Sequence, residues 1–131
     1  MQNEIPTNAI FDNNAKPKGI TRLYLALKNS CRAFSWLLKN ESAFRQEGVA
    51  LLLAIPLTFF IGVTPVEQLI LIATVLFVML IEIINTAIEV VVDRVGLEIH
   101  TLSGLAKDLG SAAVSISLIL AALTWFGICF W

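Results

Sequence analysis

Apolar residues gather in three long blocks along the chain, and short polar stretches separate the blocks. A transmembrane helix needs about 20 largely apolar residues, and the blocks at residues 48–63, 66–92 and 109–131 approach or exceed that length. The first block is the shortest and contains Pro56, whose ring removes one helical hydrogen bond. Neighbouring helices in a membrane tolerate that loss. The pattern therefore predicts three transmembrane helices.

A different periodicity precedes the first block. Between residues 20 and 39, apolar side chains return every three or four positions, which places them on one face of a helix. That face consists of Leu23, Tyr24, Leu27, Cys31, Phe34 and Leu38. Basic residues flank it, and such a stripe suits the headgroup plane of an anionic leaflet. We expect an amphipathic helix on the membrane surface; an amphipathic helix packed on protein is the alternative.

The beginning of the chain has no such periodicity. Residues 1–19 are polar, contain Pro6 and Pro17, and lack the apolar core of a signal peptide. We interpret them as a flexible N-terminal arm. Residues 20–131 are then expected to form one membrane domain.

The breaks between the spans predict how the chain folds back. Gly62, Thr64 and Pro65 separate the first two spans and predict a tight turn. These two spans should therefore form an antiparallel hairpin. The second break, at residues 93–108, is expected to be a loop on the cytoplasmic side.

Composition also indicates a membrane protein. Of the 131 residues, 57% are hydrophobic and 15% are charged, whereas a soluble domain carries about a quarter charged residues. This balance excludes a disordered chain, a nucleic-acid-binding protein and an ordinary cytosolic globule. The net charge of −1 hides a strong segregation of charges along the sequence.

The basic residues set the predicted topology. All nine Lys and Arg residues lie before residue 46 or between residues 93 and 108, so three spans place them on one side of the membrane. Short basic loops stay in the cytoplasm, which puts the N-terminus inside and the C-terminus outside. On the far side, Trp125 and Trp131 are either interfacial anchors or packing residues.

The second span ends in the stretch EIINTAIEVVVDRVG, residues 82–96, which carries polar residues at helical spacing. Steps of three or four return to the same helical face. The polar members of that face are Glu82, Asn85, Thr86, Glu89 and Asp93. Carboxylates inside a membrane are costly, which favours a functional site, whether catalytic or an ion or proton path. A polar seam that joins helices is the structural alternative.

A second acidic cluster, NESAFRQEG at residues 40–48, comes just before the first span. It is expected at the same membrane boundary as the end of the polar face. Taken alone, it indicates a capped helix start with an ordinary ion pair between Glu41 and Arg45.

A third cluster lies in residues 98–114 and contains His100, the only histidine. A lone loop histidine is most often a surface residue, whereas Lys107 offers a point charge that suits phosphate. Together the clusters suit divalent metal chemistry, because Mg²⁺ binds through one or two carboxylates plus substrate phosphates. The sequence has no P-loop and no dinucleotide fingerprint.

These three stretches, NESAFRQEG, EIINTAIEVVVDRVG and HTLSGLAKDLGSAAV, resemble the prokaryotic diacylglycerol kinase family over about residues 20–126. The resemblance implies transfer of the ATP γ-phosphate to the primary hydroxyl of diacylglycerol, which gives phosphatidate. It also implies a bacterial inner-membrane homotrimer with an N-terminal surface helix and three transmembrane helices. A related branch phosphorylates undecaprenol, but the segments KDLGSAAV and RQEG favour the diacylglycerol branch.

The resemblance also implies residue roles. Glu82 is the general base that takes the proton of the lipid hydroxyl, and Asn85 orients it. Glu41 and Glu89 are the Mg²⁺ ligands. The positions that match nucleotide contacts are Arg22, Asn29, Glu41, Glu89, Glu98, His100, Lys107 and Asp108. The positions that match the lipid-binding region are Arg22, Ser30, Ala43, Phe44, Arg45, Gln46, Glu47 and Glu82.

Two other functional classes fit the same residues. A small proton- or cation-coupled transporter would use Glu82 and Glu89 as its path and would consume no ATP. A non-catalytic membrane scaffold would use them only for assembly, so that Glu82→Gln changes assembly but no turnover.

Overall fold

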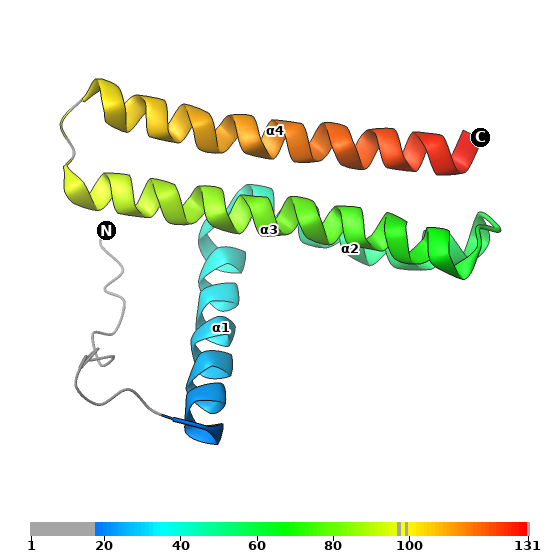
Figure 1. Cartoon of the computed structure of the whole chain (residues 1–131), viewed down its shortest axis with the longest axis horizontal. Helices are drawn as coiled ribbons and strands as arrows, with labels where there is room; N and C mark the ends of the chain where they lie inside the picture. The colour runs from blue at the N-terminus through cyan, green and yellow to red at the C-terminus, as the bar shows by residue number, and fades with distance from the viewer. Residues whose placement is uncertain (1–17, 97, 99, 131) are drawn as a thin grey trace. The chain divides into compact units, whose positions relative to one another are not determined.

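A computed structural model describes residues 18–130, apart from residues 97 and 99. Its helices are α1 (Ile20–Asn40), α2 (Ser42–Phe60), α3 (Pro65–Val95) and α4 (Thr101–Phe130) (Figure 1). Of these, α2, α3 and α4 are long and apolar enough to cross a membrane. The prediction of an all-helical protein with three helices able to span a membrane is confirmed. Most of the predicted arm, and Trp131, lie outside the described residues.

The chain divides into two units at the boundary between Trp36 and Leu37, and the first unit holds most of α1. The apolar face expected on this helix is exposed, including Leu23, Tyr24 and Leu27. On the same helix, Arg32 Nη2 donates a hydrogen bond of 3.3 Å to Asn29 Oδ1. The binding of α1 to a membrane surface stays a prediction.

In the second unit, α2 and α3 form a hairpin whose turn is encoded locally. Gly62 has a φ of +72°, in the left-handed region that glycine adopts without a steric penalty. Thr64 then caps α3: its Oγ1 accepts from the Glu67 N–H (3.3 Å), and its own N–H donates to Glu67 Oε2 (2.7 Å). This reciprocal capping box and Pro65 in the first turn of α3 fix where the helix begins. The expected tight turn is present.

A buried polar link joins α2 to α3 near this turn. Thr58 is only 1% exposed, and its hydroxyl accepts a hydrogen bond from Gln68 Nε2 (3.0 Å) while donating to the Ile55 carbonyl (2.7 Å). Polar groups in apolar surroundings are stable only when such partners are present. The link therefore fixes the register of the hairpin.

Replacing Thr58 with valine should destabilise the hairpin. Valine has nearly the same shape as threonine but leaves the Gln68 amide without its acceptor, at a cost of about 1–2 kcal/mol. Thr58→Ser keeps the hydroxyl and is the matched control. Unfolding by a denaturing detergent, followed by circular dichroism, measures the difference; equal unfolding midpoints for the two variants would show that the link contributes nothing.

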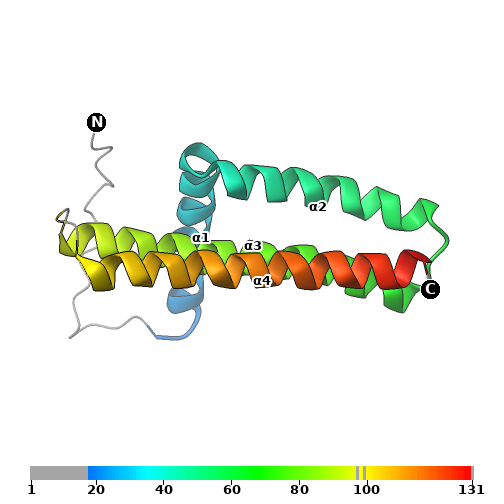
Figure 2. The same ribbon diagram turned by 90° about the horizontal axis from the view of Figure 1, so that it is seen from above.

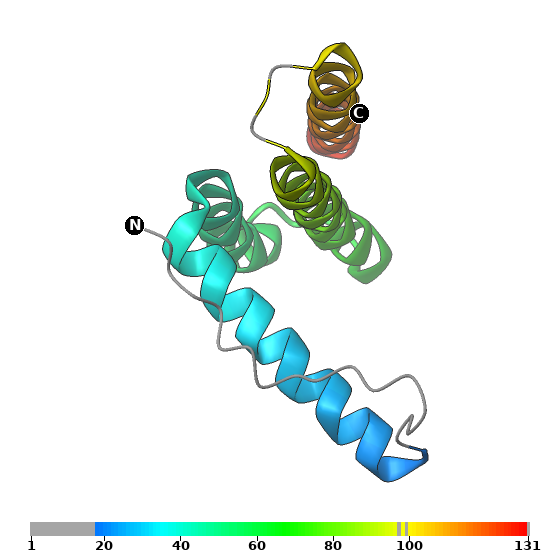
Figure 3. The same ribbon diagram turned by 90° about the vertical axis from the view of Figure 1, so that its left-hand side faces the viewer.

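Helix α3 packs against both α2 and α4. It lies between them when the helices are seen end-on (Figure 3), whereas α4 overlies α3 in the view from above (Figure 2). It runs antiparallel to α4 (Figure 1). The two helices come close at Gly110, where an added Cβ would lie 3.2 Å from Asn85 Cγ and 3.8 Å from Asn85 Cα. A small residue at this position permits the approach, and it brings α4 onto the polar face of α3.

Two boundaries differ from the sequence-based expectation. The connection between α3 and α4 is shorter than residues 93–108, because α3 continues to Val95 and α4 begins at Thr101. Likewise, α2 begins at Ser42 rather than near residue 48. Charges indicate where hydrocarbon ends, but a helix continues beyond that border because its hydrogen bonds are internal.

Candidate functional site

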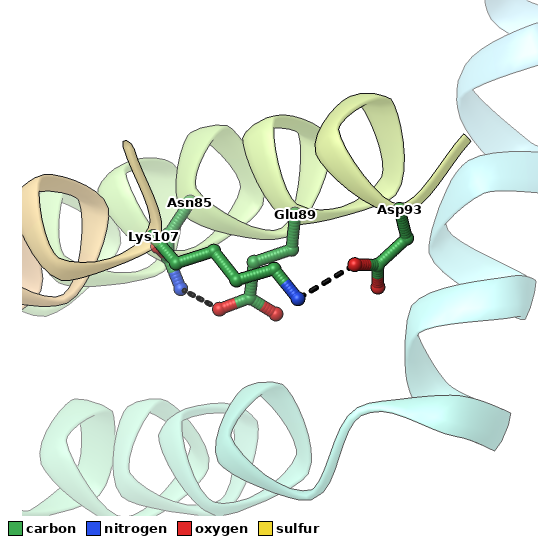
Figure 4. Close-up of polar contacts among 4 residues, drawn as sticks. All are labelled: Asn85, Glu89, Asp93 and Lys107. Carbon is green, nitrogen blue, oxygen red and sulfur yellow. Dashed lines mark hydrogen bonds and ion pairs between the residues drawn. The ribbon is translucent and has the colours of Figure 1, made fainter. Parts of the chain in front are cut away.

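The polar face expected on α3 exists as a continuous row of side chains. Glu82, Asn85 and Thr86 are buried, with 7%, 8% and 5% of their surface exposed. Glu89 is half-buried and Asp93 is exposed. Figure 4 shows Asn85, Glu89 and Asp93 in succession along the helix. The face thus runs from a buried carboxylate to an accessible one.

Asn85 connects this row through its side-chain amide. Its Nδ2 donates a hydrogen bond of 3.1 Å to Glu89 Oε1, one turn further along α3 (Figure 4). Its Oδ1 is buried and accepts no hydrogen bond from the described residues. The amide therefore orients Glu89, and its expected action on Glu82 stays a prediction.

The start of α2 adds further carboxylates to the row. The negative charge of Glu82 interacts with those of Glu41 and Glu89, and also with that of Glu47. Glu47 Oε2 is buried and has no hydrogen-bond partner among the described residues. Like charges repel each other, and a bound cation or a shared proton would relieve that repulsion.

The assignment of Glu41 and Glu89 as magnesium ligands stays a prediction. Across the part of the chain that the structure describes, no three His, Cys, Asp or Glu side chains gather in a metal-binding group. Mg²⁺, however, is usually held by one or two carboxylates together with substrate phosphates. Glu41 and Glu89 each interact electrostatically with Glu82, and these two carboxylates are the ones that the prediction assigns to the ion.

A pocket of about 240 Å³ lies where α3 ends and α4 begins. Three of the residues assigned to a nucleotide by resemblance line it, namely Glu98, His100 and Lys107. Its other lining residues are Val92, Asp93, Gly96, Ser103 and Gly104. Asp108 is exposed on α4 and does not line this pocket.

His100 has a structural role in the wall of the pocket. Its Nδ1 accepts a hydrogen bond of 3.2 Å from the Leu102 N–H, and its carbonyl accepts one of 3.0 Å from the Gly104 N–H. The side chain thus satisfies one of the free N–H groups at the start of α4. Because Nδ1 is engaged, the ring is held with Nε2 as the nitrogen available to a ligand.

Lys107 reaches across from α4 to α3. Its Nζ lies 2.6 Å from Asp93 Oδ1, and the charge of Glu89 also attracts it. Figure 4 shows the ammonium between these two carboxylates. Sequence reasoning found Asp93 on the polar face but missed this partner, because 14 positions and a helix connection separate the pair.

The lipid-binding segment assigned by resemblance, residues 43–47, forms the first turns of α2. Phe44 within it is buried. The expected ion pair between Glu41 and Arg45 is wrong: Arg45 Nη1 instead donates to the carbonyls of Leu38 (3.2 Å) and Lys39 (3.3 Å). Those carbonyls have no intrahelical donor at the end of α1, so they attract the guanidinium.

The remaining assigned residues belong to the first unit. Arg22, Asn29 and Ser30 are exposed positions of α1. The structure describes this unit by itself, so their roles in binding nucleotide and lipid stay predictions. The residue assignments in the second unit stay predictions as well, although Glu41, Glu82 and Glu89 interact electrostatically.

Comparison with known proteins agrees with the resemblance seen in the sequence. The profile of the prokaryotic diacylglycerol kinase family matches residues 28–129. A diacylglycerol kinase of Haemophilus influenzae is 47% identical over 115 residues, which cover 88% of this chain and 98% of that protein. The diacylglycerol kinase of Escherichia coli K12 is 50% identical over 107 residues, which cover 82% of this chain and 88% of that protein. That of Pseudomonas aeruginosa is 39% identical over 107 residues, with coverages of 82% and 87%.

Proposed function

The chain belongs to the prokaryotic diacylglycerol kinase family, and on that premise we propose that it phosphorylates membrane diacylglycerol with ATP. The primary hydroxyl oxygen of the lipid forms a bond to the γ-phosphorus, and the bond to the bridging oxygen of ADP breaks. The hydroxyl proton passes to the protein. The products are phosphatidate and ADP.

The observation that carries this proposal is Glu82, a buried carboxylate on a helix apolar enough to cross a membrane. A lipid hydroxyl is held near the membrane boundary, so its base has to be reachable from an apolar environment. Glu82 is the proposed general base, because a positioned carboxylate can accept a proton from an attacking hydroxyl. Asn85, one turn away on the same buried face, is proposed to orient Glu82.

The charges around the polar face supply the second requirement of the reaction. In phosphoryl transfer, the protein mainly positions the reacting groups and neutralises phosphate charge. Lys107 offers an ammonium from the wall of the pocket, and Glu41 and Glu89 are the proposed ligands of Mg²⁺. When bound, this ion neutralises phosphate charge and orients the transferred group.

We assign the two substrates to different parts of the site, one to the pocket and the other to the start of α2. We assign ATP to the pocket lined by Glu98, His100 and Lys107, with Asp108, Arg22 and Asn29 as further contacts. The lipid is assigned to residues 43–47 next to Glu82, with Ser30 and Arg22 on α1. The segregation of the basic residues supports a site on the cytoplasmic side of the bacterial inner membrane, and we propose that the assembly is a homotrimer.

An acceptor panel tests the proposed function. The purified protein is assayed in mixed micelles with Mg²⁺, ATP labelled in the γ-phosphate, and diacylglycerol, monoacylglycerol or undecaprenol. We expect the label chiefly in phosphatidate. Preferential labelling of undecaprenol would assign the protein to the undecaprenol kinase branch. Cation flux across liposomes without ATP consumption would identify it as a transporter.

Glu89→Gln should raise the Mg²⁺ requirement of the reaction. The amide removes one anionic ligand but keeps a side-chain oxygen, so Asn85 can still donate to it. We expect the Mg²⁺ concentration for half-maximal activity to rise about 10- to 100-fold. Magnesium titration at saturating ATP measures this, and an unchanged requirement would contradict the assignment of Glu89 as a ligand.

A further inference from the structure

The ion pair between Lys107 and Asp93 is a feature of the pocket to which the proposed reaction assigns no role. Its two charged atoms lie 2.6 Å apart, and the pair ties α4 to α3 (Figure 4). Both residues line the pocket together with Glu98 and His100. Among the residues that the structure describes, it is the one ion pair. It therefore connects the two helices at the place assigned to the nucleotide.

The pair is too exposed to contribute much to folding. The Lys107 side chain is 41% exposed and that of Asp93 is 55% exposed. In such surroundings, water and salt screen the attraction, and holding two long side chains in one geometry costs entropy. The main physical consequence of the pair is therefore the orientation of the Lys107 ammonium, which stands on a flexible stem.

Lys107 keeps hydrogen-bond donors for a further anion, although carboxylates surround it. Asp93 contacts the ammonium directly, Glu89 attracts it, and Glu98 lines the same pocket. An ammonium has three N–H donors, so its contact with Asp93 leaves donors for a phosphate oxygen. A ligand that meets an ammonium already held in place does not have to immobilise it on binding.

We propose that Asp93 is a positioning residue for the polyphosphate of the nucleotide, and that it acts by holding Lys107 in the pocket. The inference rests on the proposed function, because it assigns Asp93 to the same site. Asp93 itself repels phosphate, since both carry negative charge. Its favourable effect must therefore pass entirely through Lys107.

A double-mutant cycle tests this relation on the full-length protein in mixed micelles. Asp93→Asn should raise the KM for ATP about tenfold and leave the KM for diacylglycerol within about twofold. In a Lys107→Ala background, the same Asp93→Asn change should no longer raise the KM for ATP, because the only effect left is the loss of repulsion between Asp93 and phosphate. Asp93→Glu keeps the carboxylate and should restore most of the lost affinity, because the lysine stem can adapt.

Binding of MgATP without any lipid acceptor keeps the test independent of catalysis. By titration calorimetry, Asp93→Asn should weaken MgATP binding about tenfold, whether or not the wild-type protein phosphorylates lipid. If the wild-type protein binds MgATP but labels no acceptor, the proposed reaction is contradicted. The role of Asp93 in MgATP binding can then still be measured by calorimetry. Wild-type protein that does not bind MgATP would overturn both.

Several results would overturn the role of Asp93 alone. Unchanged or tighter MgATP binding by Asp93→Asn would mean that repulsion of phosphate outweighs any positioning. A full effect in the Lys107→Ala background would mean that Asp93 acts without Lys107. A variant that fails to fold, or that loses affinity for both substrates alike, would show that the pair is structural.

Discussion

Glu82→Gln is expected to lower kcat about 10²- to 10⁴-fold, the range over which general bases contribute to catalysis. Glutamine has the shape of glutamate but cannot accept the hydroxyl proton. The KM for ATP should change little, because Glu82 lies on the buried part of α3, away from the pocket lining. Initial rates of phosphatidate formation at saturating ATP and diacylglycerol measure the loss.

The stability of the Glu82→Gln variant separates catalysis from assembly. Removing the Glu82 charge relieves its repulsion with Glu41 and Glu89, so resistance to unfolding should not fall. Glu67→Gln is the matched control: it changes a glutamate of the same helix that belongs to the capping box at the other end. This control should keep wild-type turnover. If the turnover of Glu82→Gln stayed within a few-fold of the wild-type value, Glu82 would not be the general base.

Gly110→Ala is expected to disturb both the helix packing and the site. The added Cβ would overlap the side chain of Asn85, with Cγ only 3.2 Å away. Asn85 would have to turn, which breaks its hydrogen bond to Glu89. Overpacking of this kind costs about 1–3 kcal/mol. We expect lower resistance to unfolding together with a raised Mg²⁺ requirement.

Gly127→Ala on the same helix is the control for this change. A Cβ at Gly127 meets no atom within 4 Å, so the substitution only raises the helix propensity of α4. Its stability and turnover should equal or exceed those of the wild type. Gly110→Ala with wild-type stability and magnesium response would show that α3 and α4 do not approach each other at Asn85.

The apolar blocks were sufficient to predict three helices that can span a membrane, because hydrocarbon tolerates few charges. The polar face of α3 was also predictable, since residues 82–96 repeat at helical spacing within one element. Both features depend on local sequence alone. For that reason the row from Glu82 to Asp93 could be predicted without any knowledge of tertiary packing.

Contacts between elements could not be predicted in the same way. The ion pair of Lys107 with Asp93 and the approach of Gly110 to Asn85 depend on how α4 is rotated against α3. No periodicity within a single helix specifies that rotation. Helical spacing predicted an ion pair of Arg45 with Glu41. The Arg45 guanidinium instead donates hydrogen bonds to backbone carbonyls at the end of α1. Side-chain patterns do not show such backbone acceptors.

The most direct measurement is the transfer of labelled γ-phosphate from ATP to diacylglycerol by the purified wild-type protein, with Glu82→Gln assayed alongside. The product is identified by mass as phosphatidate, and its amount is compared with the ADP released. We expect equal amounts of phosphatidate and ADP from the wild type, and a loss of about 10²- to 10⁴-fold in the variant. ADP release without phosphatidate, or no labelled lipid with any acceptor, would contradict the assignment of a lipid kinase.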